Sequence, residues 1–304
     1  GAKVYGFSNN VPTKPSHFDS IKFLFEEDIQ GDIRDVNTFK NYISKIKPDF
    51  LFHLAAQSLV NSSYEKPKLT WETNLIGTVN ILDSLRYIDN KCIAIFITSD
   101  KCYDNKEWEW GYRETDQLGG SDLYSGSKAA TEILINSYKH SFFNNNKFVK
   151  IASARAGNVI GGGDWSSNRI IPDIIRGWDK NKDVLIRNPN ATRPWQHVLE
   201  PLSGYLALAA HMLNNKKLDG ETFNFGPSDS QINTVSNVIT AIKKYLPKNS
   251  LKLKKANIII NEHHYLKLNC DKALNLLNWN ASLNFDETIK FTMEWYLAYY
   301  KFPN

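Results

Sequence analysis

Short apolar runs alternate with stretches of helical periodicity over the first half of the chain, and this alternation restricts the fold more than any other feature. Unbroken apolar runs are typical of strands buried on both faces, whereas apolar residues three or four apart are typical of helices. A strand–helix alternation predicts an α/β fold with a doubly wound parallel sheet. We expect strands over residues 2–7, 50–55, 93–98 and 149–155, and helices over residues 35–46, 70–85, 124–140 and 170–178.

The pattern loosens after Gly157, where a helix over 201–213 and a strand over 222–226 are the last elements predicted to join the sheet. The remaining segments combine helices with short strands and are predicted to form a smaller C-terminal part. The expected larger part comprises residues 1–157 and 200–226, and the expected smaller part comprises residues 158–199 and 227–304.

A hydroxyl, a carboxylate and an amine follow the apolar run over residues 92–97. They belong to Ser99, Asp100 and Lys101, with the hydroxyl of Thr98 directly before them. Side chains of a strand alternate between the two faces of a sheet, so we expect Ser99 to face the site and Thr98 to point the other way. Open α/β sheets place their ligands at the carboxyl ends of the strands. The segment is therefore a candidate for acid–base chemistry.

Tyr124 and Lys128 lie four residues apart at the start of the helix predicted over residues 124–140. Residues four apart share one face of a helix, so the phenol and the amine are predicted to point toward the same neighbour. A Tyr and a Lys at this spacing occur by chance in many helices. Together with the strand-end hydroxyl of Ser99, they predict a site for proton transfer.

Composition argues against several other classes of protein. No apolar run approaches the roughly 20 residues of a membrane-spanning helix, and no basic segment precedes an apolar leader, so we expect a cytoplasmic protein with no membrane partner. The three cysteines are an odd number without metal-type spacing, and we expect neither disulfides nor a bound metal. The net charge of +5 is spread over the chain, which favours an anionic small molecule over a nucleic acid as partner.

One element of a dinucleotide-binding sheet is missing from the sequence. Such a Rossmann-type fold begins with a strand, a Gly-rich turn and a helix whose N-terminus holds the pyrophosphate. Here Gly1 leads directly into what is predicted to be the second strand, and the run Gly161-Gly162-Gly163 follows a late strand instead. The first strand is central in the common strand order. We therefore expect the biological chain to have a segment upstream of this sequence.

Five motifs give the chain a resemblance to the extended short-chain dehydrogenase/reductase family, and within it to the dehydratases that act on CDP-glucose. Its Ser-Asp-Lys at the strand end differs from the Thr-Asp-Glu expected in relatives that act on dTDP-glucose. Two features depart from the family: the missing Gly-rich turn, and a second strand that ends in Gly6-Phe7-Ser8 without the carboxylate that commonly binds the ribose. The motifs are Thr98-Ser99-Asp100-Lys101-Cys102-Tyr103, Tyr124-Ser125-Gly126-Ser127-Lys128, the segments 155–165 and 193–201, and His264-Tyr265-Leu266-Lys267-Leu268.

The resemblance implies NAD as a bound, recycled hydride carrier and a nucleotide sugar, CDP-glucose, as substrate. Tyr124 would take the proton of the C4 hydroxyl, and Ser99 would hydrogen-bond the same oxygen. Lys128, together with the positive nicotinamide, would stabilise the phenolate and lower the pKa of the phenol. Oxidation at C4 acidifies the C5–H bond. Lys101 would then act as base at C5 and Asp100 as acid at the C6 hydroxyl. Asp100 and Lys101 could instead form a neighbouring ion pair, with these roles reversed or shared.

The resemblance also implies residues that hold the two ligands. The substrate would contact Asn158 and Arg193, because an Arg forms bidentate contacts with phosphate, although Arg193 could instead be solvated. By likeness to the family, we expect a homodimer built through the helices over residues 70–85 and 124–140. The cofactor would contact Asp32, Ile33, Ala55, Ala56 and Gln57, besides Tyr124 and Lys128. Asp32 could instead cap a turn, and small residues after a strand could reflect tight packing.

Two other functions stay open at this point. Another epimerase or dehydratase of the same family would also use Tyr124 and Lys128, although epimerisation at C4 needs no acid–base pair such as Asp100 and Lys101. The second alternative is an inactive fragment that binds no NAD, because the Gly-rich turn is missing from the sequence.

Overall fold

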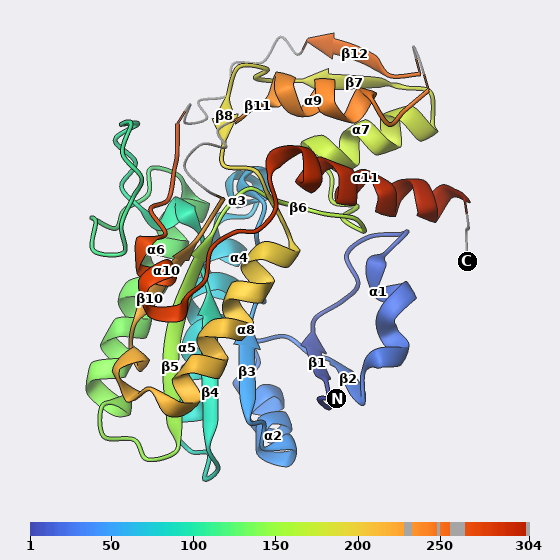
Figure 1. Cartoon of the computed structure of the whole chain (residues 1–304). Coiled ribbons are helices and arrows are strands. Elements are labelled where there is room, and N and C mark those ends of the chain that lie inside the picture. The colour runs from blue at the N-terminus through green and yellow to red at the C-terminus, as the bar shows by residue number, and fades with distance from the viewer. Residues whose placement is uncertain (228–232, 248–249, 256–264, 302–304) are drawn as a thin grey trace.

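A parallel sheet of four strands forms the centre of the computed structural model, which describes residues 1–227, 233–247, 250–255 and 265–301 (Figure 1). The strand order is β10-β5-β4-β3, and each neighbouring pair is parallel. The sequence prediction of an α/β fold with a parallel sheet is confirmed. His264, and parts of the predicted smaller part, lie outside the described residues. The strands are β3 (Phe50–His53), β4 (Cys92–Ile97), β5 (Val149–Ala156) and β10 (Thr222–Phe225).

A second, two-stranded parallel sheet consists of β1 (Tyr5–Ser8) and β2 (Glu27–Gln30). Within the described residues, β1 pairs only with β2 and β3 pairs only with β4, so each has one edge without a partner strand. Figure 1 shows β1 next to β3. Tyr5 and Phe50, on these two strands, are exposed. The two parallel sheets are therefore separate in the described part of the chain.

Helices cover both faces of the four-stranded sheet, as a doubly wound fold requires (Figure 1). On one face, Ala94 and Phe96 of β4 share a core with α2, α5 and α6. On the other face, Ile93 and Ile95 of the same strand share a core with α8 and α10. Successive residues of β4 therefore belong to opposite cores, which explains its unbroken apolar sequence. These helices are α2 (Val36–Ile46), α5 (Gly77–Leu85), α6 (Leu123–Tyr138), α8 (Leu199–Asn214) and α10 (Asp271–Leu277).

The helix predicted over residues 70–85 is longer than expected and contains a π-helical turn. It follows α3 (Val60–Glu65) and consists of α4 (Pro67–Trp71), the π-turn η2 (Glu72–Ile76) and α5. Pro67 begins α4 because a proline lacks only an N–H that the first helical turn leaves unpaired. The π-turn was not predictable from apolar spacing, because one extra residue per turn barely changes the pattern over so short a stretch.

The remaining segments pack around an apolar core of their own at one end of the sheet (Figure 1). This core joins Ile174 of α7, Val184 of β7, Ile242 of α9 and Met293 of α11. Within the described part of the chain, no helix combines the length and the apolar character that crossing a membrane requires. The elements here are β6 (Val159–Ile160), α7 (Ile170–Asp179), β7 (Asp183–Ile186), β8 (Thr192–Arg193), β9 (Gln196–His197), β11 (Asn233–Thr234), α9 (Val235–Lys243), β12 (Lys252–Lys255) and α11 (Phe285–Lys301).

Several short helical turns complete the chain. α1 (His17–Ile21) continues into η1 (Lys22–Leu24) before β2 begins. The π-turn η4 (Lys139–Phe143) extends α6, and η5 (Lys216–Leu218) follows α8. The His17 ring lies edge-on to the Trp295 ring, with the centroids 5.4 Å apart, so α1 contacts α11.

Replacing Leu208 with alanine tests the packing of α8 on the sheet. Leu208 is fully buried, whereas Leu206 of the same helix is 61% exposed. We expect Leu208→Ala to lower the free energy of unfolding by about 2–5 kcal/mol, because the truncation leaves a cavity in a close-packed core. The matched Leu206→Ala should change it by less than about 0.5 kcal/mol. Urea denaturation measures both values, and equal losses would contradict this packing.

Candidate active site

The carboxyl end of β4 carries the polar residues predicted there. β4 ends at Ile97, and after Ser99 the chain enters the 3-10 helix η3 (Asp100–Cys102). The Ser99 hydroxyl oxygen accepts a hydrogen bond from the Lys101 backbone N–H at 3.2 Å, which holds this turn. Ser99, Asp100 and Lys101 all line one cavity of about 400 Å³.

Helix α6 brings Tyr124 to the same cavity. The carboxylate of Asp122 caps the helix by accepting hydrogen bonds from the backbone N–H groups of Tyr124 and Ser125, both at 3.0 Å. Tyr124 is almost buried and lines the cavity together with the strand-end residues. Lys128, one turn further, is buried, and its Nζ donates a hydrogen bond to the carbonyl oxygen of Ile97 at 3.4 Å. The phenol therefore faces the cavity, and the amine lies against the end of β4.

Burial shifts the pKa values of Tyr124 and Lys128 toward their uncharged forms. It raises the pKa of Tyr124 to about 12, although hydrogen bonding with Ser99 opposes the shift. It lowers the pKa of Lys128 to about 8, against the charge of Glu132. The groups that lower the pKa of Tyr124 here are Ser99 and Arg169. The expected effect of Lys128, acting together with a positively charged nicotinamide, stays a prediction.

Asp100 is buried in the lining of the cavity, with 2% of its surface exposed. The Ser99 hydroxyl donates a hydrogen bond to Oδ1 at 3.0 Å, and the Asn158 side-chain amide donates one to Oδ2 at 3.3 Å. Burial raises the pKa of Asp100, while Lys101, the Ser99 hydrogen bond and Arg193 oppose the rise. A carboxyl group with a raised pKa is suited to donating a proton near neutral pH.

Gly157, at the end of β5, makes room for this carboxyl group. A Cβ atom at Gly157 would lie only 1.8 Å from Oδ2 of Asp100, so any other residue would displace it. The next residue, Asn158, has a φ of 51°, in the left-handed region that asparagine tolerates better than most residues. Sequence reasoning missed the role of Gly157. The available signal was a glycine directly after a buried strand, which often marks a close approach of another group.

The two residues predicted to bind the substrate both line the cavity. Asn158 reaches Asp100, and Arg193 of β8 donates a hydrogen bond from Nη1 to the carbonyl oxygen of Thr192 at 2.8 Å. Two further arginines in the lining were not singled out from the sequence. Arg169 pairs with Asp164 at 3.2 Å, and Arg187 donates a hydrogen bond to the carbonyl oxygen of Asn168 at 2.8 Å. Three arginines thus line the cavity.

Asp32 and Ile33, predicted to contact the cofactor, follow β2. The Asp32 carboxylate pairs with Arg34 at 2.6 Å and also accepts a hydrogen bond from the Arg34 backbone N–H at 2.9 Å. The Arg34 side chain holds the pKa of Asp32 below its ordinary value. Asp32 therefore does stabilise its own turn, as the alternative interpretation expected. Ile33 is buried, and its carbonyl oxygen accepts a hydrogen bond from the Asn80 side chain at 2.9 Å.

The other predicted cofactor contacts, Ala55, Ala56 and Gln57, follow β3 and are half-buried. The backbone N–H of Gln57 donates to the Asn74 side chain at 2.8 Å, and the Asn74 amide donates to the Ser127 hydroxyl of α6 at 2.9 Å. Asn74 thus connects the end of β3 to the helix that carries Tyr124. None of the five predicted cofactor contacts in the segments after β2 and β3 is among the described residues that line the cavity.

Side chains that commonly bind metal ions do not cluster in the described part of the chain. In residues 1–227, 233–247, 250–255 and 265–301, no group of three His, Cys, Asp or Glu side chains is placed so that it could hold one.

Comparison with known proteins assigns the chain to a family. The sequence profile described as GDP-mannose 4,6 dehydratase matches residues 4–292. The CDP-glucose 4,6-dehydratase of Salmonella typhimurium is 43% identical over 98% of this chain and 85% of its own length. The CDP-paratose 2-epimerase of Salmonella typhi is 23% identical over 88% of this chain and 84% of its own length.

Two solved structures share the fold at lower identity. Pal from Bacillus thuringiensis has a TM-score of 0.83 at 22% identity, covering 97% of this chain and 91% of that one. The dTDP-glucose 4,6-dehydratase of Bacillus anthracis, solved in complex with NAD, has a TM-score of 0.78 at 17% identity, covering 99% and 89%. The chain therefore belongs to the extended short-chain dehydrogenase/reductase family, in its group of nucleotide-sugar 4,6-dehydratases.

Proposed function

We propose that the protein dehydrates CDP-glucose to the CDP-linked 4-keto-6-deoxy sugar, with NAD as a recycled cofactor. The observation that carries the proposal is the meeting of Tyr124, Asp100 and Lys101 in one cavity. A tyrosine alone would serve oxidation at C4, but loss of water across C5 and C6 also needs an acid and a base. The relative named as a CDP-glucose 4,6-dehydratase supports the choice of nucleotide.

The residues after β2, β3 and β4 fit NAD. The Asp32 carboxylate is half-buried and ionised, so it can accept hydrogen bonds from the hydroxyl or amino groups of a nucleoside. Ala55 and Ala56 leave space for a close approach, and Lys128 can donate to a ribose hydroxyl. Bound NAD supplies the acceptor for the C4 hydride and returns that hydride to C6. Two structures of this fold contain NAD, from Bacillus anthracis and Bacillus cereus.

Tyr124 and Ser99 serve the C4 hydroxyl in this proposal. Tyr124 takes the hydroxyl proton, and Ser99, which hydrogen-bonds with the phenol, also orients the reacting oxygen. A pKa of about 12 keeps Tyr124 protonated at neutral pH. Nearby positive charge must therefore stabilise the phenolate, and the buried Lys128 is the residue of α6 placed to contribute to it.

Asp100 and Lys101 serve the elimination. Asp100 donates a proton to the leaving C6 oxygen, which its raised pKa favours. Lys101 removes the proton at C5 and returns a proton to C5 when hydride is delivered to C6. The half-buried position of Lys101 at the cavity wall leaves it within reach of a bound sugar. The opposite assignment, with Asp100 as base, requires the buried carboxyl group to be ionised. Burial disfavours that form, so we prefer Asp100 as the acid.

The smaller C-terminal part is proposed to hold the nucleotide. Arg169, Arg187 and Arg193 line the cavity next to the acid–base residues, and guanidinium groups bind phosphate oxygens in bidentate geometry. Asn158 contributes its amide at the boundary between the two regions. A diphosphate bound by these arginines would direct the attached sugar toward Asp100.

We also propose a homodimer formed through η2 and α6. Ile76 and Ile133 project from these helices with 48% and 57% of their surfaces exposed, which is unusual for isoleucine. A second copy of the same helices would cover them in a four-helix arrangement. The cytoplasmic location stays a prediction from the sequence.

Incubation with CDP-glucose tests the proposed function. With NAD present, we expect a 4-keto-6-deoxy product and no net reduction of NAD, because the hydride returns to the sugar. Chromatography with mass spectrometry detects the loss of water, and absorbance follows reduced cofactor. UDP-, GDP- and dTDP-glucose serve as matched substrates. An epimerised product without loss of mass would favour the epimerase alternative. Absence of any product from all four nucleotide-glucoses would contradict the proposed enzymatic function.

Replacing Lys101 with alanine tests the elimination step. We expect Lys101→Ala to lower the rate of product formation by about 10²- to 10⁴-fold, the usual contribution of a general base. Oxidation at C4 should survive, so reduced cofactor should accumulate on the enzyme. Lys106→Ala is the matched control, because Lys106 is an exposed lysine paired with Asp104 at 2.6 Å. Full turnover by Lys101→Ala would exclude Lys101 as the base.

A further inference from the structure

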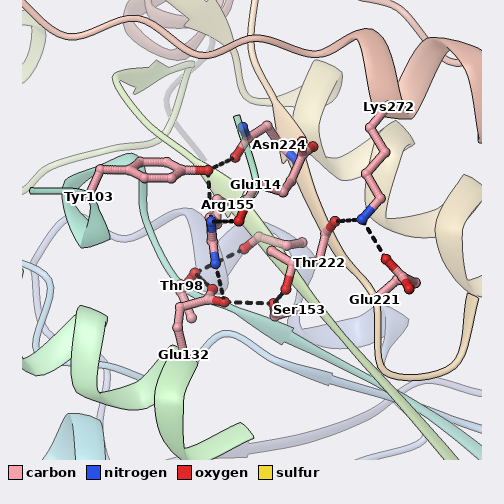
Figure 2. A network of polar contacts seen from close by, with 11 residues as sticks. Thr98, Tyr103, Glu114, Glu132, Ser153, Arg155, Glu221, Thr222, Asn224 and Lys272 are labelled. Carbon is pink, nitrogen blue, oxygen red and sulfur yellow. Dashed lines mark hydrogen bonds and ion pairs between the residues drawn. The ribbon is translucent and has the colours of Figure 1, made fainter. Parts of the chain in front are cut away.

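A buried ion pair lies in the interior between α6 and β5 (Figure 2). Nη2 of Arg155 is 2.8 Å from Oε2 of Glu132, and the two side chains are 3% and 2% exposed. Burying two charges costs free energy unless further hydrogen bonds satisfy them. Both Glu132 and Arg155 make such hydrogen bonds, and their partners lie on either side of the segment that carries Ser99, Asp100 and Lys101.

The carboxylate end holds the residue before Ser99. Thr98 donates its hydroxyl hydrogen to Oε1 of Glu132, and Ser153 of β5 donates to Oε2 at 2.9 Å. Thr98 is therefore fixed with its hydroxyl toward α6. Because neighbouring side chains in an extended segment point in opposite directions, this turns Ser99 toward the cavity.

The guanidinium end holds the residue after η3. Nη1 of Arg155 donates a hydrogen bond to the Tyr103 hydroxyl at 2.8 Å, and the guanidinium lies 4.8 Å from the centroid of the Tyr103 ring. The Tyr103 hydroxyl in turn donates to Oδ1 of Asn224 at 2.8 Å, which ties it to β10. Figure 2 shows Arg155 between Tyr103 on one side and Glu132 on the other.

The ion pair therefore brackets the segment that carries Ser99, Asp100 and Lys101. Its carboxylate binds the residue on one side of that segment, and its guanidinium binds the residue on the other. Glu132 also belongs to α6, one turn beyond Lys128 and two turns beyond Tyr124. One charged pair thus connects α6, which carries Tyr124, to the turn that carries Asp100 and Lys101.

We propose that Glu132 and Arg155 are positioning residues that set the Asp100–Lys101 turn against Tyr124, acting through Thr98 and Tyr103. This inference rests on the proposed function and extends it to four residues that do not perform the chemistry themselves. A displacement of about 1 Å at reacting groups can cost about 100-fold in rate, so a hydrogen bond remote from the substrate can matter.

The test removes one hydrogen bond at each end of the bracket and leaves the ion pair intact. Thr98→Val and Tyr103→Phe each delete a hydroxyl with little change of shape. We expect kcat for dehydration of CDP-glucose to fall by about 10- to 100-fold in each, because the elimination groups are no longer held in place. KM should change less than about twofold, and reduced cofactor should accumulate, since C4 oxidation is less affected than elimination. Thr98→Ser keeps the hydroxyl and should restore kcat.

Two control variants remove a comparable buried hydroxyl elsewhere. The Thr292 hydroxyl donates to the Thr288 carbonyl oxygen at 2.8 Å in α11, and the Tyr42 hydroxyl donates to the Gly6 carbonyl oxygen at 3.1 Å. We expect Thr292→Val and Tyr42→Phe to lose as much free energy of unfolding as Thr98→Val and Tyr103→Phe do, measured by urea denaturation. Unlike those two variants, they should keep the wild-type kcat.

The outcomes separate the inference from the proposed function. If the wild type converts CDP-glucose but Thr98→Val and Tyr103→Phe keep its kcat, the positioning role is overturned and the proposed function stands. The same holds if Thr98→Ser loses as much activity as Thr98→Val, or if Thr98→Val does not fold and Tyr103→Phe keeps full activity. If the wild type converts no nucleotide-glucose, the proposed function fails and the inference fails with it.

Discussion

Strand β4 hydrogen-bonds to β3 on one side and to β5 on the other, and its two faces belong to opposite apolar cores. Parallel pairing makes neighbouring strands end at the same edge of the sheet, so Ser99 after β4 and Gly157 after β5 meet there. The approach is close enough that only a glycine fits beside the Asp100 carboxyl group. The geometry of the candidate site thus follows from the pairing of two largely buried strands.

Burial also determines the charge states at this edge. It raises the pKa of Asp100 and of Tyr124, and it lowers the pKa of Lys128 to about 8. In the proposed cycle Asp100 donates a proton, Tyr124 accepts one, and positive charge must stabilise the phenolate of Tyr124 when it forms. The pKa of Glu132 is lowered although burial by itself would raise it. The charge of Arg155 and the hydrogen bonds from Arg155, Thr98 and Ser153 outweigh the effect of burial. The site therefore combines reacting groups whose pKa values are shifted by burial with a charged pair that holds the neighbouring residues.

The predictable features were those that depend on local pattern. The apolar run of β4 and the periodicity of α6 indicated a parallel sheet, and the polar residues after β4 indicated the site, because both signals lie within a few residues along the chain. β2 was not predicted as a strand, since its four residues include two acids and no alternation. Gly157 and the Glu132–Arg155 pair depend on contacts between distant segments, which no single-sequence pattern records. The raised pKa of Tyr124 was not predictable either, because it results from burial in the folded protein.

The central claim is that one cavity oxidises C4, eliminates water across C5 and C6, and returns the same hydride to C6. The most direct measurement follows the fate of the hydrogen on C4. With CDP-glucose deuterated at C4, mass spectrometry of the product should find the deuterium retained, and nuclear magnetic resonance should place it on C6. Loss of the deuterium to solvent, or its retention at C4, would contradict the account.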